Sequence, residues 1–439
     1  MSLILPTRRG IIRAGAGALA AAATPAHAWK AHGGGTYLGL VCTRCQTLGT
    51  PNATYSYVQS RSFHFARTAF NQLQVMLPGW FQGYGENTLT GNVVYQAWLE
   101  YPIGTLYQFK WSGSGSVTAT AGSCTPLSDV LALPNIPNGA TVYLNVLADF
   151  HLTYGACYGW PVTAYAAGGD GCILGTSAFS APTGGAIGLT AGAAPIFPMA
   201  LVAPTNKPAV FIMGDSRQVG YGDTADSSGD TGEFARLVGS QFAYFNGGSG
   251  GEQAATALGI TPYAWNYGAA VTASGFANRS LVAPYTTHVM SGYGVNDMNQ
   301  GSATNSGCES YIQQCWGLVP HKPIFQATIM DFTVSTDNFK TIANQSGSGT
   351  PYHWAPLGAN ISNAINTWLR AYPAGLNYLV DVSSAIETST HGNGLNSGQW
   401  PADGVTQYLS TPDGLHESAY MLGVIKTSLA SAVQSAIHF

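Results

Sequence analysis

The sequence predicts a protein of the α/β class, with a parallel sheet over residues 206–439 preceded by a β-sandwich-like region within 29–205. From about residue 206, short apolar runs alternate with segments of helical periodicity. This pattern indicates buried parallel strands covered by helices on both faces. Before that point, stretches rich in Val, Tyr, Phe, Trp and Thr are interrupted by Gly, Pro and Asn. Such stretches favour short antiparallel strands.

Residues 1–28 have the features of an export signal. A basic start is followed by an Ala-rich apolar stretch and by small residues on either side of His27, as in cleaved signals. Arg8 and Arg9 are adjacent, which resembles the twin-arginine type. We therefore expect a secreted or periplasmic bacterial protein, an N-terminal membrane anchor being the alternative. No other stretch reaches the roughly 20 apolar residues of a spanning helix, so we expect no stable membrane insertion.

The composition narrows the range of partners. Of the 439 residues 8% are charged, and the formal net charge is −4, whereas an average soluble protein has about 25% charged residues. Removal of the signal takes away three basic residues and no acidic one, so the mature chain is more acidic still. Because no basic run could follow a phosphate backbone, the sequence predicts no nucleic-acid partner.

Seven cysteines predict disulfides, with one thiol left over, if the protein is exported. The pairing cannot be read from the sequence, but Cys157 with Cys172 and Cys308 with Cys315 are the nearest neighbours. The CTRC segment at 42–45 could also suggest zinc or redox chemistry. A zinc site would need a second ligand pair at matching spacing, and none is evident, so a structural disulfide is favoured there.

Several segments carry the predicted elements, taken in chain order. In the N-terminal region strands are expected within 91–102, 106–113 and 140–154, while 62–76 fits either long strands or a helix. A Gly, Ala and Pro-rich stretch at 180–208 is predicted to be a linker. Five parallel strands are predicted at 209–214, 263–268, 287–294, 323–330 and 377–383, and a closing helix within 417–439.

Three short motifs fall near the ends of predicted elements in the C-terminal region. These are GDS at 214–216, GVND at 294–297 and DGLH at 413–416. Each is weak alone, because such residues are common in turns and a lone histidine is usually structural. In an open α/β sheet, however, the carboxyl ends of the strands form one edge, which is where such proteins place their sites.

Together and in this order, the motifs resemble those of the SGNH or GDSL hydrolase family. The matching residues are Ser216 with Gly220, then Gly294, Asn296 and Asp297, then Asp413 and His416. The resemblance covers roughly 206–439 and implies a flavodoxin-like three-layer α/β/α hydrolase domain. It also implies a serine ester hydrolase that needs no cofactor and no metal.

The resemblance assigns a role to each matching residue. Ser216 is the expected nucleophile, His416 its general base, and Asp413 the acceptor that orients the imidazole. Oxyanion donors are expected from the Ser216 backbone N–H, the Asn296 side chain and the backbone N–H of a glycine. In the family this glycine belongs to a further motif, which follows the second strand of the sheet. That glycine commonly follows an Asn by five residues, a position that Val271 occupies in NYGAAVTASG at 266–275. Gly268 is therefore the preferred third donor, with Val271 as the alternative.

Other acidic and aromatic residues are expected to be structural. Asp215 and Asp297 are predicted to hold turns, although Asp215 is a minor alternative as the partner of the base. Asp223, Asp226 and Asp230 resemble a calcium loop but lack the closing Glu of an EF-hand. Five tryptophans could line a sugar site and are more simply expected in the core: Trp265, Trp316, Trp354, Trp368 and Trp400.

The sequence therefore predicts a secreted serine ester hydrolase that acts through an acyl-enzyme. A carbohydrate O-acetyl ester is the favoured substrate, because a β-rich region precedes the predicted hydrolase in an exported, aromatic-rich chain. One alternative is a lipase, arylesterase or thioesterase acting on short acyl chains. Another is a non-catalytic carbohydrate-binding or surface protein with a degenerate hydrolase domain. The fold and the triad alone do not choose the substrate.

Overall fold

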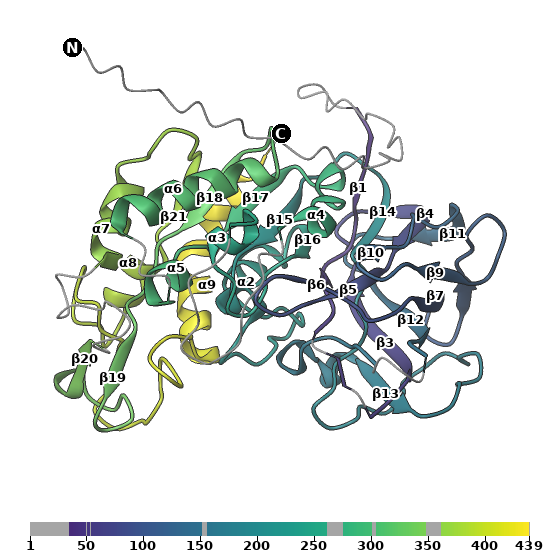
Figure 1. The fold of residues 1–439 in the computed structure, drawn as a ribbon, viewed down its shortest axis with the longest axis horizontal. Helices are drawn as coiled ribbons and strands as arrows, with labels where there is room; N and C mark the ends of the chain where they lie inside the picture. The colour runs from purple at the N-terminus through teal and green to yellow at the C-terminus, as the bar shows by residue number, and fades with distance from the viewer. Residues whose placement is uncertain are drawn as a thin grey trace, which may run out of the picture. The chain divides into compact units, whose positions relative to one another are not determined.

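The computed structural model describes residues 35–438 apart from 50, 53, 152–155, 261–274, 301–303 and 348–360 (Figure 1). All of these belong to one compact unit, Gly34–Phe439. The predicted export signal, residues 1–28, lies outside the described residues. No helix in the described part of the chain has the length and apolar character needed to cross a bilayer.

A six-stranded parallel sheet forms the centre of the C-terminal region. Its strands in spatial order are β2 (Cys45–Gln46), β16 (Ala243–Asn246), β15 (Ala209–Met213), β17 (His288–Ser291), β18 (Ile324–Ala327) and β21 (Tyr378–Val380). Without β2, the order is second, first, third, fourth, fifth along the chain, which is the flavodoxin-like order. The strand beside β15 is β16, not the predicted 263–268, which lies outside the described residues.

Helices cover both faces of this sheet, as predicted. Val210 and Ile212 belong to one core with α2 (Glu233–Val238), α8 (Val382–Glu387) and α9 (Ala419–Ala436). Phe211 belongs to the other core, with α3 (Ala254–Ala257), α5 (Val295–Gln300), α6 (Asn305–Cys315) and α7 (Ile361–Arg370). Successive residues of a strand point to opposite faces, so β15 is buried on both sides and the three-layer arrangement follows.

Short elements connect these layers. They are α1 (Ser216–Val219), α4 (Ala277–Ser280), the 3-10 helices η3 (Ala283–Tyr285), η4 (Trp316–Leu318) and η5 (Ile342–Asn344), and the hairpin of β19 (Thr333–Ser335) and β20 (Gln345–Gly347). Helix α1 begins three residues after the end of β15. The β19–β20 hairpin precedes α7 in the chain.

The N-terminal region consists mainly of antiparallel strands, as the sequence predicts. One sheet has the order β1 (Tyr37–Leu40), β14 (Ala200–Thr205), β4 (Phe70–Met76), β11 (Leu131–Ile136). A second has β13 (Gly171–Gly175), β3 (Tyr57–Phe65), β12 (Thr141–Asp149), β7 (Val93–Glu100) and β8 (Leu106–Gln108), with β9 (Val117–Ala119) also on β7. A third has β10 (Ser123–Cys124), β5 (Pro78–Gln82) and β6 (Glu86–Thr88), and two 3-10 helices follow β12, η1 (Pro161–Thr163) and η2 (Ala166–Gly168).

Two undecided or unexpected segments are resolved here. The segment 62–76, which fits either strand or helix in the sequence, belongs to strands β3 and β4. The predicted linker at 180–208 includes β14, which pairs with both β1 and β4. The sandwich packing of the sheets stays a prediction.

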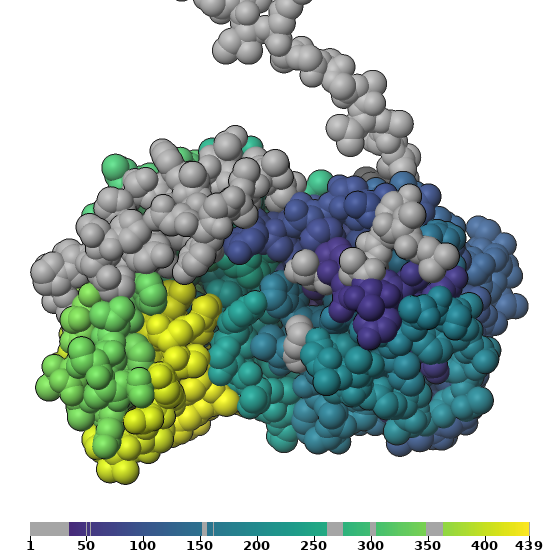
Figure 2. Space-filling model, turned by 60° about the horizontal axis from the view of Figure 1, so that its bottom comes forward, coloured from purple at the N-terminus to yellow at the C-terminus, as the bar shows by residue number. Residues whose placement is uncertain are grey.

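The parallel sheet also includes a strand from the N-terminal region. Strand β2 pairs in parallel with β16, although it precedes the predicted domain boundary at 205/206 by more than 150 residues. In the space-filling view, purple and blue residues of the N-terminal region and yellow residues near the C-terminus lie on either side of teal residues (Figure 2). The two predicted domains therefore share hydrogen-bonded structure, while the boundary itself stays a prediction.

The structure contradicts the predicted disulfides. All seven cysteines are free thiols and six of them are buried. Cys308 and Cys315 are seven residues apart on α6, about 10 Å along the helix axis, whereas a disulfide needs Cα atoms within about 7 Å. Burial raises the pKa of all seven thiols, which makes them poor nucleophiles and metal ligands.

Candidate active site

Ser216 lies at a tight turn where β15 passes into α1. Gly214 has φ +147°, and a side chain there would meet the Gln218 carboxamide at 2.4 Å, so glycine is required. Asp215 caps the helix: its carboxylate accepts from the Arg217 N–H at 3.0 Å, and its own N–H donates to Gln218 Oε1 at 3.0 Å. This reciprocal capping fixes Ser216 as the first helical residue, at the carboxyl end of the strand.

The predicted triad residues come together in one hydrogen-bonded chain. Ser216 Oγ lies 2.8 Å from His416 Nε2, and His416 Nδ1 lies 2.6 Å from Asp413 Oδ2. The other oxygen of Asp413 accepts from the backbone N–H groups of Leu415 and His416, each at 2.9 Å. Residues 200 positions apart thus adopt the nucleophile, base and orienting-carboxylate geometry.

The Asp413 carboxylate is held in its ionised form. Burial alone would raise its pKa, but the hydrogen bond and charge of His416, with two backbone N–H groups, outweigh burial and lower the pKa. An ionised acceptor at His416 Nδ1 keeps the Nδ1–H tautomer and leaves Nε2 able to accept the proton of Ser216.

Asn296 follows β17 in helix α5 and is buried. Its side-chain Nδ2 donates to the backbone carbonyl of Glu252 at 3.0 Å, which uses one of its two N–H groups. The neighbouring Asp297 accepts from the N–H groups of Ala254 and Ala255 at 2.9 and 3.1 Å, at the start of α3. Asp297 is therefore structural, as expected, and one N–H of the Asn296 amide has no acceptor recorded among the described residues.

Another candidate for the third donor lies in the loop after β16. Gly268 and Val271 are outside the described residues, and the strand beside β15 is β16, which ends at Asn246. Gly251 follows Asn246 by five residues, the spacing that the resemblance requires, and has φ +74°. The sequence NGGSGG at 246–251 has this spacing, but it follows a strand that the sequence does not predict.

The loop after β16 reaches the nucleophile turn. The Ser249 N–H donates to the Gly214 carbonyl at 2.9 Å, and Asn296 binds the residue that follows Gly251. Among the described residues, the backbone N–H groups of Ser216 and Gly251 have no hydrogen-bond acceptor. These two backbone N–H groups, with the amide of Asn296, are hydrogen-bond donors of the kind that stabilise an oxyanion.

A buried ion-pair network joins the segments of the nucleophile and the base. Arg217 donates to Glu417 Oε1 from Nε at 2.9 Å and from Nη2 at 2.6 Å, and it also binds Glu233. Gln218 donates to the second oxygen of Glu233 at 2.6 Å. Because Arg217 follows Ser216 and Glu417 follows His416, this network restrains the separation of the nucleophile and the base.

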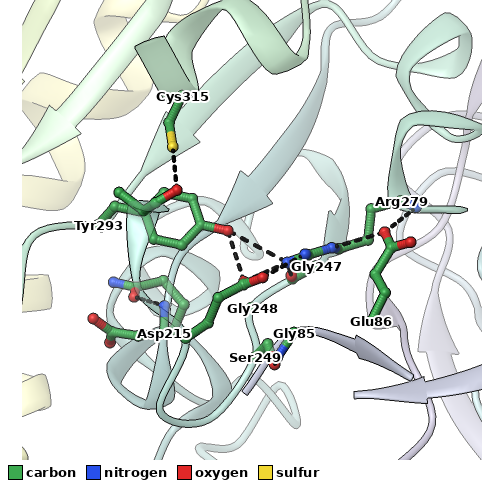
Figure 3. Close-up of polar contacts among 12 residues, drawn as sticks. Gly85, Glu86, Asp215, Gly247, Gly248, Ser249, Arg279, Tyr293 and Cys315 are labelled. Carbon is green, nitrogen blue, oxygen red and sulfur yellow. Dashed lines mark hydrogen bonds and ion pairs between the residues drawn. The ribbon is translucent and has the colours of Figure 1, made fainter. Parts of the chain in front are cut away.

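The β5–β6 hairpin of the N-terminal region is hydrogen-bonded to the loop at 247–252, after β16 (Figure 3). The Tyr84 N–H donates to the Gly250 carbonyl at 3.0 Å, and the Gly85 N–H donates to Ser249 Oγ at 2.9 Å. Glu86 accepts from Arg279, whose guanidinium also donates to both oxygens of Glu252 at 2.6 Å. The N-terminal region thus contributes to the position of the loop that carries Gly251.

The other acidic candidates have structural partners. Asp223 pairs with Arg236 at 2.5 Å, and Asp226 pairs with Lys426 at 2.8 Å. Asp230 accepts from the Tyr244 hydroxyl at 2.7 Å. No group of three or more metal-ligating side chains gathers in the described part of the chain.

The tryptophans suggested for a sugar site are placed mostly in cores. Trp316 and Trp400 are buried, and Trp316 stacks on Trp368 at 6.0 Å between ring centroids. Trp265 and Trp354 lie outside the described residues. None of the described members of this set touches the triad in the contacts that the structure records.

Comparisons with known proteins add only distant likenesses. No protein-family model matches the chain, and no curated protein sequence matches it. Similar solved structures include a carbohydrate acetylesterase from Sinorhizobium meliloti, with 13% identity, TM-score 0.31, and coverage of 52% of this chain and 99% of that chain. A family two carbohydrate esterase from Clostridium thermocellum, in complex with cellohexaose, has 14% identity, TM-score 0.32, and coverage of 89% and 94%.

A further similar structure is a peptidoglycan O-acetylesterase, with 11% identity, TM-score 0.35, and coverage of 94% of this chain and 81% of that chain.

Proposed function

We propose that this protein is a serine ester hydrolase that acts through an acyl-enzyme. The observation that carries the proposal is the continuous chain from Ser216 Oγ through His416 to Asp413, at 2.8 and 2.6 Å. A serine hydroxyl becomes a useful nucleophile only when an adjacent base removes its proton. The position of Ser216 at the carboxyl end of β15 places that group at the edge where α/β sheets hold their ligands.

The chemistry proceeds in two steps. In the first, Ser216 Oγ bonds to the ester carbonyl carbon while His416 Nε2 takes the hydroxyl proton. The bond from that carbon to the alcohol oxygen then breaks, and the alcohol leaves with the proton from His416. In the second, His416 takes a proton from water as the water oxygen bonds to the acyl carbon. The bond from that carbon to Ser216 Oγ then breaks, Oγ takes the proton back from His416, and the acid leaves.

The carbonyl oxygen becomes negatively charged in each step. We assign its donors as the backbone N–H of Ser216, the backbone N–H of Gly251 and the free N–H of Asn296, replacing the predicted Gly268. Each donor is attached to a fixed element: a capped helix, a loop held from two sides, and helix α5. Donors that are fixed before reaction stabilise the developing charge most effectively.

The favoured substrate is an O-acetyl ester on a carbohydrate, and export of the protein remains part of this proposal. The N-terminal region is hydrogen-bonded to the loop at 247–252. This contact supports an extended ligand that meets both parts. The abundance of aromatic residues, 11% of the chain, and its few charges suit a neutral polar ligand better than an ionic one.

Hydrolysis of p-nitrophenyl acetate by the purified chain tests the reaction class. We expect turnover by the wild type and loss of at least about 10³-fold in Ser216→Ala. Ser435→Ala is a matched control, since Ser435 is exposed on α9 and should retain full activity. An inactive wild type, or an active Ser216→Ala variant, would refute the proposal.

A further inference from the structure

A cluster of aromatic side chains lies directly beside the triad. The ring of Tyr221 lies 5.4 Å from the ring of His416, measured between centroids, and it is tilted by 33°. The ring of Trp160 lies 5.4 Å from the ring of Tyr221, at 67°. Tyr221 therefore contacts both the general base and a tryptophan of the N-terminal region.

The cluster also borders the loop that supplies the oxyanion donor. A side chain at Gly250 would begin 3.4 Å from Trp160 Cη2 and 3.6 Å from Tyr221 Cε2. Gly250 is the residue before Gly251, and its carbonyl accepts from the Tyr84 N–H. The aromatic rings thus border the loop that carries Gly251, the donor proposed above.

These side chains reach solvent although their backbones are fixed. Tyr84 and Tyr221 are 38% and 36% exposed, and Trp160 is partly exposed. The backbone of Tyr84 is hydrogen-bonded to Gly250, the residue that borders the rings of Trp160 and Tyr221. Burial first, and then the phenol of Tyr84, raise the pKa of Tyr221. The indole nitrogen of Trp160 lies against the Gln82 carboxamide, so the orientation of the indole is restrained.

The chemistry of the cluster fits one class of ligand. A pyranose ring offers apolar C–H faces and hydroxyl edges, and Tyr and Trp offer apolar faces with a polar tip. Rigid aromatic side chains contribute contact area at a low cost in conformational entropy. The absence of charge on these three side chains also matches a neutral sugar better than a phosphate or a carboxylate.

We propose that Trp160, Tyr221 and Tyr84 form the subsite that binds the sugar ring carrying the ester, on the alcohol side of the scissile bond. The inference rests on the ester hydrolase function proposed above. It assigns a specificity role to the N-terminal region, which supplies Trp160 and Tyr84. It also explains why that region is joined to the loop at 247–252, since the ring and the carbonyl must be positioned together.

The experiment compares two acetyl esters that share the chemistry but differ in the alcohol: O-acetylated xylotetraose and ethyl acetate, whose alcohol has no ring to fill the subsite. Trp160→Ala should lower kcat/KM for the sugar ester by about 5- to 30-fold, mainly through KM, the range expected for one lost aromatic contact. Activity on ethyl acetate should fall by a smaller factor than activity on the sugar ester. Trp160→Phe should recover part of the loss.

Trp368→Ala is the matched control, because Trp368 stacks on Trp316 in the helical layer and should leave the ratio of the two kcat/KM values unchanged. Equal losses on both esters in Trp160→Ala, or no loss on either, would overturn the subsite. If the wild type hydrolyses neither ester, the proposed function fails. Calorimetric binding of O-acetylated xylotetraose to Ser216→Ala, with and without Trp160→Ala, then decides the subsite: weaker binding supports it and equal binding overturns it.

Discussion

Replacement of Arg217 by Met tests whether the buried ion-pair network holds the nucleophile and the base in register. Arg217 is 2% exposed and pairs with Glu233 and Glu417, which are also buried. Met preserves the volume of the arginine stem but leaves two carboxylates facing each other without a cation. Removal of one partner from a buried pair costs about 3–5 kcal/mol. We expect the free energy of unfolding of Arg217→Met to fall by that amount.

Activity should fall as well, under conditions where the variant is still folded. Arg217 follows Ser216 and binds Glu417, which follows His416, so it restrains both segments. A displacement of either catalytic side chain by about 1 Å costs about 100-fold in rate. We therefore expect kcat for p-nitrophenyl acetate to fall by about 10- to 100-fold with little change in KM. Urea unfolding followed by tryptophan fluorescence and steady-state kinetics measure the two effects.

A second buried pair provides the control. Arg61 binds Glu100 in the N-terminal sheets at 2.8 Å, and both side chains are buried. Arg61→Met should lose comparable stability but retain kcat, because the pair joins β3 to β7 away from the triad. The reasoning is refuted if Arg217→Met unfolds at the wild-type urea concentration, or if Arg61→Met loses as much kcat as Arg217→Met.

Three further predictions concern the donor set, the response to acid and the thiols. Asn296→Ala should lower kcat on p-nitrophenyl acetate by about 10²–10³-fold, and unchanged steady-state kinetics would remove Asn296 from the oxyanion hole. Burial alone would raise the pKa of Glu100, but bonds from Arg61, Asn145 and backbone N–H groups lower it to about 2. The stability that the ionised Glu100 contributes is full above about pH 4.5 and is lost as the pH falls toward 2. The urea midpoint should therefore change less between pH 6 and pH 3 in Glu100→Gln than in the wild type. An equal change of the midpoint in both proteins would contradict this. Thiol titration in denaturant without prior reduction should count seven free cysteines, and a lower count would indicate disulfides.

The parallel sheet could be predicted from the sequence because its strands are buried on both faces. Strands such as 209–213 are continuous apolar runs, and helical periodicity between such runs indicates the covering layers. Strand β16 was not predicted, because AYFN is a short run next to several glycines. The segment 263–268 also resembles a strand and was predicted instead. Strand β2 could not be predicted, because a two-residue strand has no periodicity and its partner lies about 200 residues away.

The triad could be predicted because its residues belong to short motifs near the ends of predicted elements. Ser216 and His416 needed only the strand before the first motif and the helix after the last. The third donor depends on which strand lies beside β15. The sequence favours 263–268 as that strand and therefore Gly268 as the donor, whereas the position of β16 beside β15 is what points to Gly251.

The sequence does not predict that the N-terminal region contacts the site. Nothing in the residues around Tyr84, Glu86 or Trp160 marks them as neighbours of a motif more than 50 residues later. Their contacts depend on how the antiparallel strands pack against the loop after β16, which is a tertiary property. The disulfide prediction was wrong for a related reason, since the number of cysteines says nothing of the distances between them.

Covalent labelling with a fluorophosphonate tests the central claim most directly. An activated serine forms a bond from Oγ to phosphorus as fluoride leaves, whereas an ordinary serine does not react. Intact mass and peptide mapping should reveal one adduct per chain, at Ser216, and none in Ser216→Ala. A wild-type chain that remains unlabelled, or an adduct on another residue, would contradict the assignment of Ser216 as the nucleophile.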